Sequence, residues 1–115
     1  KPNLDAVMYL HDISSIQCSL GHYEEAIKTL QRSIYAIDVE KGGHEHALAS
    51  FATYMQLGDI FAFLGKYEES FTAYQSGFEF QIGAIGKIDR RVGETCRYLA
   101  EAHTKVTYKN SQMYY

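Results

Sequence analysis

The sequence predicts an all-α protein built as a stack of helical hairpins. The eight residues that begin at Leu20, LGHYEEAI, return 44 residues later as LGKYEESF, beginning at Leu64. Apolar residues recur every three or four positions along most of the chain, which is typical of amphipathic helices. The one proline is Pro2, so no proline interrupts the helices that follow. A repeat of this length is typical of stacked units that present a surface to another molecule, so binding is favoured over catalysis.

Two apolar stripes on either side of Gly21 predict the first hairpin. The stripe of the first helix, within residues 4–20, comprises Val7, Leu10, Ile13 and Leu20. The stripe of the second helix comprises Ile27, Leu30, Ile34 and Ile37. Glu24 and Glu25 lie in its expected first turn, where the helix dipole favours anions. We expect this helix to end at residues 41–43, Lys-Gly-Gly, because glycine adopts the left-handed conformation that ends helices.

The second hairpin has the same organisation. Its two stripes comprise Phe51, Tyr54, Leu57, Phe61 and Leu64, and then Tyr67, Phe71, Tyr74, Phe78 and Ile82. The third helix, for which Asp89 can act as the cap, has a stripe of Val92, Cys96, Leu99, His103 and Val106. No partner for it is recognisable, and residues 107–115 are interpreted either as a short final helix or as a frayed tail. Gly58 and Gly77 fall inside helices, where glycine is unfavourable, so we expect neighbouring helices to approach closely there.

Composition narrows the class of protein. The chain has 115 residues, enough for one domain, and carries 11 Lys and Arg against 14 Asp and Glu, a net charge of -3. This balance disfavours nucleic acid as a partner. Cys18 and Cys96 are too few for a disulfide scaffold and are interpreted as reduced thiols of a cytoplasmic protein. No apolar run is long enough to cross a membrane, so membrane insertion lacks support.

Catalytic and metal-binding motifs are not recognisable. His44 and His46 are two residues apart and point in different directions on a helix, unlike the four-residue spacing of helical zinc ligands. Residues 83–87 contain Gly-x-x-Gly-Lys but lack the preceding strand and the Ser or Thr of a phosphate-binding loop. The sequence therefore implies no cofactor and no enzyme.

The repeated pattern resembles a known family. It consists of large-x-x-large-small, then Leu-Gly-x-Tyr-Glu-Glu-Ala, and then an apolar stripe. The pattern is similar to the tetratricopeptide repeat, a helix-turn-helix unit of about 34 residues. The longer spacing in this chain resembles the lengthened repeats of kinesin light chains. Residues 85–92 resemble the connection in that family, although Arg90 stands near the place of its usual proline. Residues 1–5 and 91–103 look like stretches of the kinesin-light-chain-related proteins of plants.

The resemblance implies a tetratricopeptide-like α-α superhelix of about two and a half repeats. The repeats are expected at about residues 4–43, 44–88 and 89–106, which together make a repeat domain over residues 1–106. Residues 107–115 would form a terminal cap or tail. That tail contains Tyr108, Met113, Tyr114 and Tyr115, which either fold back over the third helix or present apolar surface to another chain.

The resemblance also implies a binding surface, because the first helix of each hairpin lines the concave wall of such an array. The residues that lie off the packing stripes on these helices are Met8, His11, Asp12 and Ser15, then Met55, Gln56 and Asp59, then Arg97, Tyr98 and Glu101. Our candidate peptide-binding residues are His11, Met55, Gln56, Asp59, Arg97, Tyr98 and Glu101. Such a mixture suits an extended peptide, with charge selecting its register. The alternative is an ordinary solvated helix face.

The predicted function is a non-enzymatic adaptor, similar to kinesin light chains, that docks a peptide or a partner protein on this groove. The resemblance implies that the partner could be a cytoskeletal or motor-associated protein and that the cytoplasmic protein could associate with the cytoskeleton. The competing interpretation is a structural element that assembles with other copies through repeat edges or the open C-terminal end.

Overall fold

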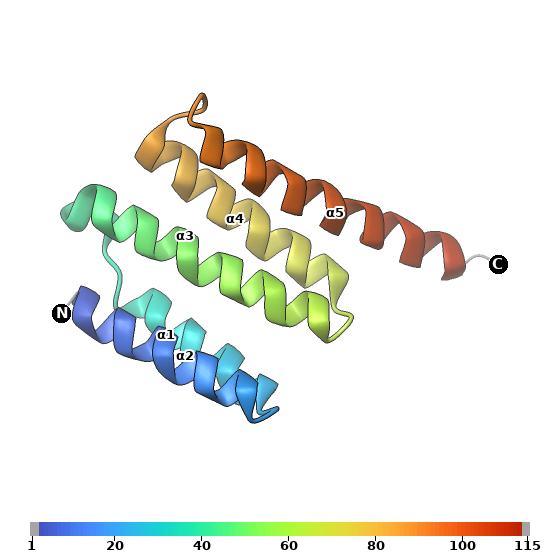
Figure 1. Ribbon diagram of the computed structural model, residues 1–115, viewed down its shortest axis with the longest axis horizontal. Helices are drawn as coiled ribbons and strands as arrows, with labels where there is room; N and C mark the ends of the chain where they lie inside the picture. Colours follow the sequence, from blue (N-terminus) through green and yellow to red (C-terminus); the bar gives the residue numbers. More distant parts are fainter. Residues whose placement is uncertain (1–2, 114–115) are drawn as a thin grey trace.

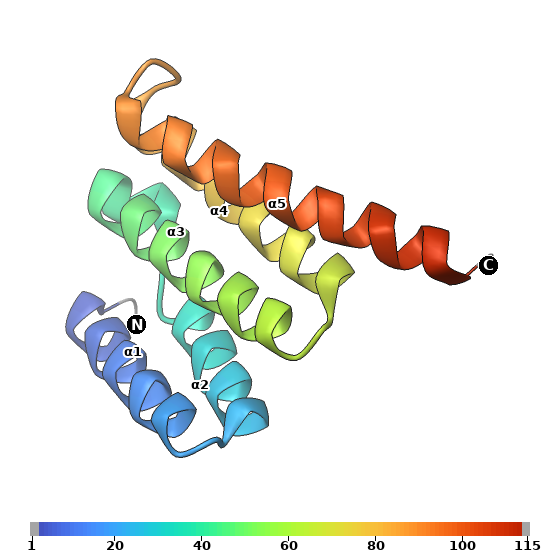
Figure 2. The same ribbon diagram turned by 45° about the vertical axis from the view of Figure 1, so that its right-hand side comes forward.

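The computed structural model describes residues 3–113, which form five helices (Figure 1). The helices are α1 Leu4–Ser19, α2 Tyr23–Tyr35, α3 Val39–Phe63, α4 Tyr67–Ile85 and α5 Arg90–Met113. Consecutive helices run in opposite directions, so α1, α3 and α5 share one direction (Figures 1 and 2). The array measures 50 × 37 × 19 Å. The predicted all-α stack of hairpins is confirmed.

The two Leu-Gly turns have the same geometry. Gly21 and Gly65 have φ angles of 78° and 75°, a left-handed conformation that favours glycine. In each turn the residue after the glycine donates its backbone N–H to the carbonyl oxygen five residues earlier. His22 donates to Gln17 and Lys66 donates to Phe61, both at 2.8 Å. The repeated sequence therefore encodes a repeated turn.

The connection between the hairpins differs from the prediction. We expected the second helix to end at residues 41–43, but α2 ends at Tyr35 and α3 begins at Val39. Asp38 caps the new helix by accepting a hydrogen bond from the Lys41 backbone N–H at 3.2 Å. Gly43, with φ 64° and ψ -139°, then kinks α3 instead of ending α2. The expectation overlooked Asp38 as a helix start.

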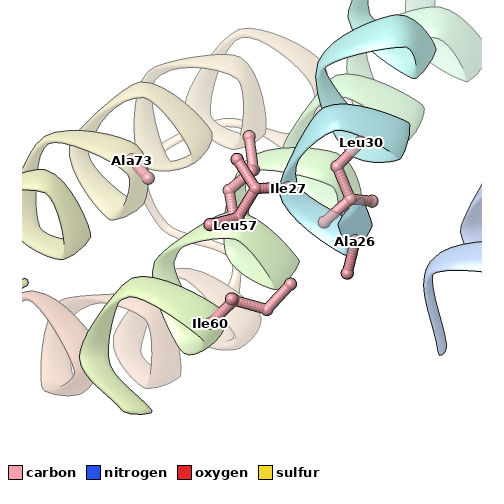
Figure 3. Packing of buried hydrophobic residues seen from close by; sticks show 6 residues of the cluster. All are labelled: Ala26, Ile27, Leu30, Leu57, Ile60 and Ala73. Atoms are coloured by element: carbon pink, nitrogen blue, oxygen red, sulfur yellow. The ribbon is translucent and has the colours of Figure 1, made fainter. Parts of the chain in front are cut away.

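The centre of the core lies where α2 and α4 meet α3 (Figure 3). Its buried residues are Ala26, Ile27, Leu30, Leu57, Ile60 and Ala73. Leu30 is completely buried, and Leu57 lies between the side chains of α2 and Ala73 of α4. This cluster therefore joins the first hairpin to the second.

Burial on α1 differs from the predicted stripe. Val7 is buried as expected, but Ile13 is 44% and Leu20 64% exposed. The buried side of α1 comprises Val7, His11 and Ser14. Because α1 packs against α2 and, over a shorter stretch, α3, its other side keeps apolar residues that no neighbour covers. The prediction for this helix was right for Val7 and wrong for Ile13 and Leu20, because it followed the apolar residues and placed the polar His11 outside.

The last helix also differs from expectation. Asp89 accepts the Arg91 backbone N–H at 3.0 Å, which confirms the expected cap, and hydrogen bonds from Arg91 lower the pKa of Asp89 to about 2. Cys96 and His103 of the predicted stripe are exposed, whereas Thr95 is buried. The helix continues to Met113, so residues 107–113 form neither a separate helix nor a tail. Tyr108 stays 67% exposed, and Tyr114 and Tyr115 lie outside the described residues.

Both interior glycines lie at close contacts, as predicted. A methyl group at Gly58 would overlap the ring of Tyr74. A Cβ at Gly77 would lie 3.4 Å from Met55 Sδ and from the Phe51 carbonyl oxygen. The absence of a side chain at these positions lets α3 and α4 pack closely.

Candidate peptide-binding surface

Two clefts lie along the A-helix face, the surface formed by α1, α3 and α5. The first, of about 370 Å³, lies between α1 and α3 and is lined by Ser14, Ser15, Cys18, Gln56, Asp59 and Ile60. The second, of about 200 Å³, lies between α4 and α5 beside Ala62 of α3, and its other lining residues are Tyr67, Ser70, Tyr74, Tyr98, Glu101, Ala102 and Lys105. The two clefts are linked because Asp59 of the first is hydrogen-bonded to Tyr74 of the second.

Tyr74 positions Asp59 on this face. The Tyr74 hydroxyl donates to Asp59 Oδ1, although the two residues belong to different helices. Tyr74 is only 5% exposed, and its ring centroid lies 5.7 Å from that of Tyr98 on α5. Burial, together with the Asp59 carboxylate, raises the pKa of Tyr74 well above its usual value, so the hydroxyl stays protonated as a donor. Asp59 is therefore held in place by a buried side chain of α4.

Charged and aromatic groups lie side by side on α5. Arg97 Nη1 lies 3.5 Å from Glu101 Oε1, one helical turn away. The Arg97 guanidinium carbon also lies 5.3 Å from the centroid of the Tyr98 ring. All three side chains are exposed, and such surface pairs contribute only about 0.2 to 0.5 kcal/mol. A ligand can therefore exchange these contacts for its own at low cost.

Of the predicted residues, Asp59 and Tyr98 contact Tyr74, and Glu101 lines the same cleft as Tyr74. Arg97 contacts Tyr98 and Glu101. Gln56 lines the neighbouring cleft between α1 and α3. Met55 is half-buried and lies against Gly77 of α4. Part of its side chain therefore packs against α4, and only the remainder is accessible to a ligand.

His11 does not lie on an exposed wall, contrary to the expectation. It is 9% exposed, and its Nε2 lies 2.7 Å from Thr53 Oγ1 of α3. Ser33 Oγ of α2 lies 3.4 Å from the same nitrogen and 3.3 Å from Thr53 Oγ1. Burial lowers the pKa of His11, partly opposed by Asp12, which favours the neutral ring. This imidazole therefore joins three helices in the interior.

Sequence reasoning missed the role of Tyr74. It assigned this residue to a packing stripe, and the residue is indeed buried, but its hydroxyl also bonds Asp59, 15 residues earlier. One feature of the sequence did point to such a residue. Gly58 is a helix-interior glycine next to Asp59, and a glycine there indicates that a large side chain of a neighbouring helix packs against it. The identity of that side chain depends on how α3 and α4 pack.

Residues 3–113 meet neither the requirements of a metal site nor those of a membrane-spanning helix. No group of three or more His, Cys, Asp and Glu side chains lies close enough there to hold a metal ion. His46 accepts the Asp38 backbone N–H at 3.0 Å through Nδ1. None of the helices described is long and apolar enough to cross a membrane.

The chain is similar to three Arabidopsis thaliana proteins. It is 45% identical to kinesin light chain-related 1 over 109 residues, which make up 95% of this chain and 18% of that protein. It is 51% identical to kinesin light chain-related 3 and 48% identical to kinesin light chain-related 2, each over 89% of this chain. Those matches cover 16% and 15% of the relatives, so the chain spans less than a fifth of their length. No solved structure matches the chain.

A family model agrees with the repeated geometry. The tetratricopeptide repeat model matches residues 9–37 and 51–80, which correspond to the α1–α2 and α3–α4 hairpins. These hairpins contain the two equivalent Leu-Gly turns, and the segment between the two matched ranges contains the Asp38 cap and the Gly43 kink. The chain belongs to the tetratricopeptide repeat family.

Proposed function

We propose that the chain is a non-enzymatic protein-interaction module that docks an extended peptide along the A-helix face. The family and the kinesin light chain-related relatives support an adaptor role. The observation that carries the proposal is the Tyr74-held carboxylate of Asp59, next to the exposed group of Arg97, Tyr98 and Glu101. A carboxylate positioned in advance binds a cationic or hydrogen-bonding group with a smaller loss of side-chain freedom.

In this mechanism each of the predicted residues except the buried His11 has a physical role. Asp59, Arg97 and Glu101 set the charge preference of the face, and Tyr98 with Met55 contributes apolar contact area. Gln56 supplies an amide that can pair with the peptide backbone. Residues on α3 and α5 can act on one ligand because Tyr74 of α4 bonds Asp59 of α3 and lies against Tyr98 of α5.

The relatives narrow the partner class. Their names refer to kinesin light chains, so a partner in a motor or cytoskeletal assembly is the first class to test. A cytoplasmic, cytoskeleton-linked location fits such a partner.

A peptide-array screen tests the A-helix face with the double variant Asp59→Lys, Arg97→Glu. We expect the native chain to bind a defined set of peptides and the variant to lose at least about tenfold in affinity for them, because both charges are inverted. The control is Glu79→Lys, Lys87→Glu, which makes the same charge changes at exposed positions that line none of the clefts described here. Equal binding by both double variants would contradict the proposal.

A specific observation favours a second candidate function, self-association, at the N-terminal end of the array. Tyr9, Ile13 and Ile16 of α1 are 70%, 44% and 60% exposed, and Leu20, which follows the last residue of α1, is 64% exposed. Exposed apolar stripes of this kind often mark contacts with other chains. Our expectation placed such a contact at repeat edges or the open C-terminal end, and the exposed residues of α1 add a further surface to test.

Light scattering across a concentration series tests this second candidate. If α1 mediates association, Ile13→Lys is expected to shift the native oligomer to monomer at every concentration while its helical circular dichroism spectrum stays unchanged. Ile88→Lys is the matched control, because Ile88 is fully exposed and lies outside α1. A native chain that stays monomeric throughout would remove this candidate.

A further inference from the structure

We infer that a second peptide site lies in the α2–α4 groove, the cleft between α2 and α4 over α3, and that it takes a basic peptide with one large apolar side chain. The groove has a volume of about 450 Å³. It is lined by Gln31, Ile34, Tyr54, Leu57, Phe61, Glu68, Glu69, Thr72, Ala73 and Ser76. None of these residues lines either cleft of the A-helix face, so this site is separate from the proposed function.

The inner part of the groove is apolar and comes from three helices. Tyr54, Leu57 and Phe61 of α3 lie beside Ile34 of α2 and Ala73 of α4. Figure 3 shows Leu57 between α2 and α4, with the small side chain of Ala73 on the facing helix. Apolar lining with a few polar groups is typical of ligand pockets. The inner part of the groove is suited to one aliphatic or aromatic side chain.

The edge of the groove on α4 is acidic. Glu68 and Glu69 are exposed and form no ion pair with any residue between 3 and 113. The nearby cations have other contacts: Lys66 lies 3.7 Å from Glu24, and Lys109 donates to the Gly65 carbonyl oxygen at 3.2 Å. Two carboxylates beside an apolar cleft complement Arg or Lys, because charge attraction strengthens where water is partly excluded.

The polar groups on the walls fit an extended backbone. Gln31 of α2 faces Thr72 and Ser76 of α4 across the groove, and an amide or hydroxyl can donate to or accept from a peptide unit. The occupant is therefore a peptide segment of a partner protein, with an apolar residue in the groove and basic residues next to it that reach the acidic edge on α4.

Fluorescence anisotropy tests the inference with a labelled probe, acetyl-Arg-Arg-Phe-Arg-Gly-amide, and the full chain. We expect saturable binding that weakens about tenfold in Glu68→Gln, Glu69→Gln, which retains side-chain size and removes both charges. The matched control is Glu79→Gln, Glu94→Gln, two exposed glutamates outside the groove. Two control peptides, with Ser for Phe or with Glu for each Arg, are expected to bind at least about tenfold more weakly.

A second variant distinguishes this groove from its neighbours. Glu68 and Glu69 also line a cleft with Val106 and Lys109 of α5, whereas Ser76 lines only the α2–α4 groove among the clefts described here. Ser76→Trp fills the groove and is expected to abolish probe binding, with folding checked by its melting curve. Unchanged binding to Ser76→Trp or to the two-glutamine variant, or no binding by the native chain, would overturn the inference. Loss in Asp59→Lys, Arg97→Glu alone would assign the probe to the A-helix face and overturn it as well.

Discussion

Replacing Leu30 by alanine is expected to lower the free energy of unfolding by about 2 to 5 kcal/mol. Leu30 is completely buried and belongs to the cluster that joins α2 to α3 and α4. The change removes apolar contacts and leaves a cavity that the surrounding helices fill only in part. Since this cluster links the two hairpins, the loss is expected to affect the whole array. Urea denaturation followed by circular dichroism measures the change.

Tyr35→Ala is the control on the same helix. Tyr35 lies at the last position of α2 and is 89% exposed, so its removal is expected to change stability by less than about 0.5 kcal/mol. If Leu30→Ala costs no more than Tyr35→Ala, the core does not lie where the structure places it.

Gly58→Ala is expected to lower the free energy of unfolding by about 1 to 3 kcal/mol, although alanine is the better helix former. The added methyl group would overlap the ring of Tyr74, a buried residue that cannot move far. A displaced ring would also weaken the hydrogen bond from the Tyr74 hydroxyl to Asp59. We therefore expect weaker peptide binding on the A-helix face together with the loss of stability, measured on the same samples.

Gly83→Ala is the matched control in α4. A Cβ at Gly83 meets no atom within 4 Å, so the gain in helix propensity is unopposed and a stabilisation of about 0.5 to 1 kcal/mol is expected. Opposite signs for the two glycines are the expected result. A stabilising Gly58→Ala would mean that α4 lies further from α3 than described.

Local features of the chain were predictable because they depend on few neighbours. The turn at Gly21 was predicted and recurs at the equivalent Gly65 of the repeated segment, since a left-handed backbone strongly favours glycine. Asp89 was correctly assigned as a cap, since its carboxylate accepts a hydrogen bond from the backbone N–H of Arg91, only two residues later. The repeat itself was visible as a recurring segment, and the family match covers both hairpins that contain it.

Features that depend on packing between helices were not predictable in the same way. The apolar spacing of α1 does not reveal which side meets α2, so Ile13 and Leu20 were placed inside and His11 outside. On the candidate surface, Arg97, Tyr98 and Glu101 could be grouped because they share one exposed stretch of α5. Tyr74 joined them only through the packing of α4 against α3 and α5.

The sequence by itself determined the helical class, the repeated hairpin and the turns, because periodicity, glycine conformation and capping act over a few residues. The tertiary structure alone decided which side of α1 is buried, where α2 ends and α3 begins, and which side chain holds Asp59. These outcomes depend on contacts between residues far apart in the chain, where a buried polar group such as His11 is stable only if another helix supplies its partner.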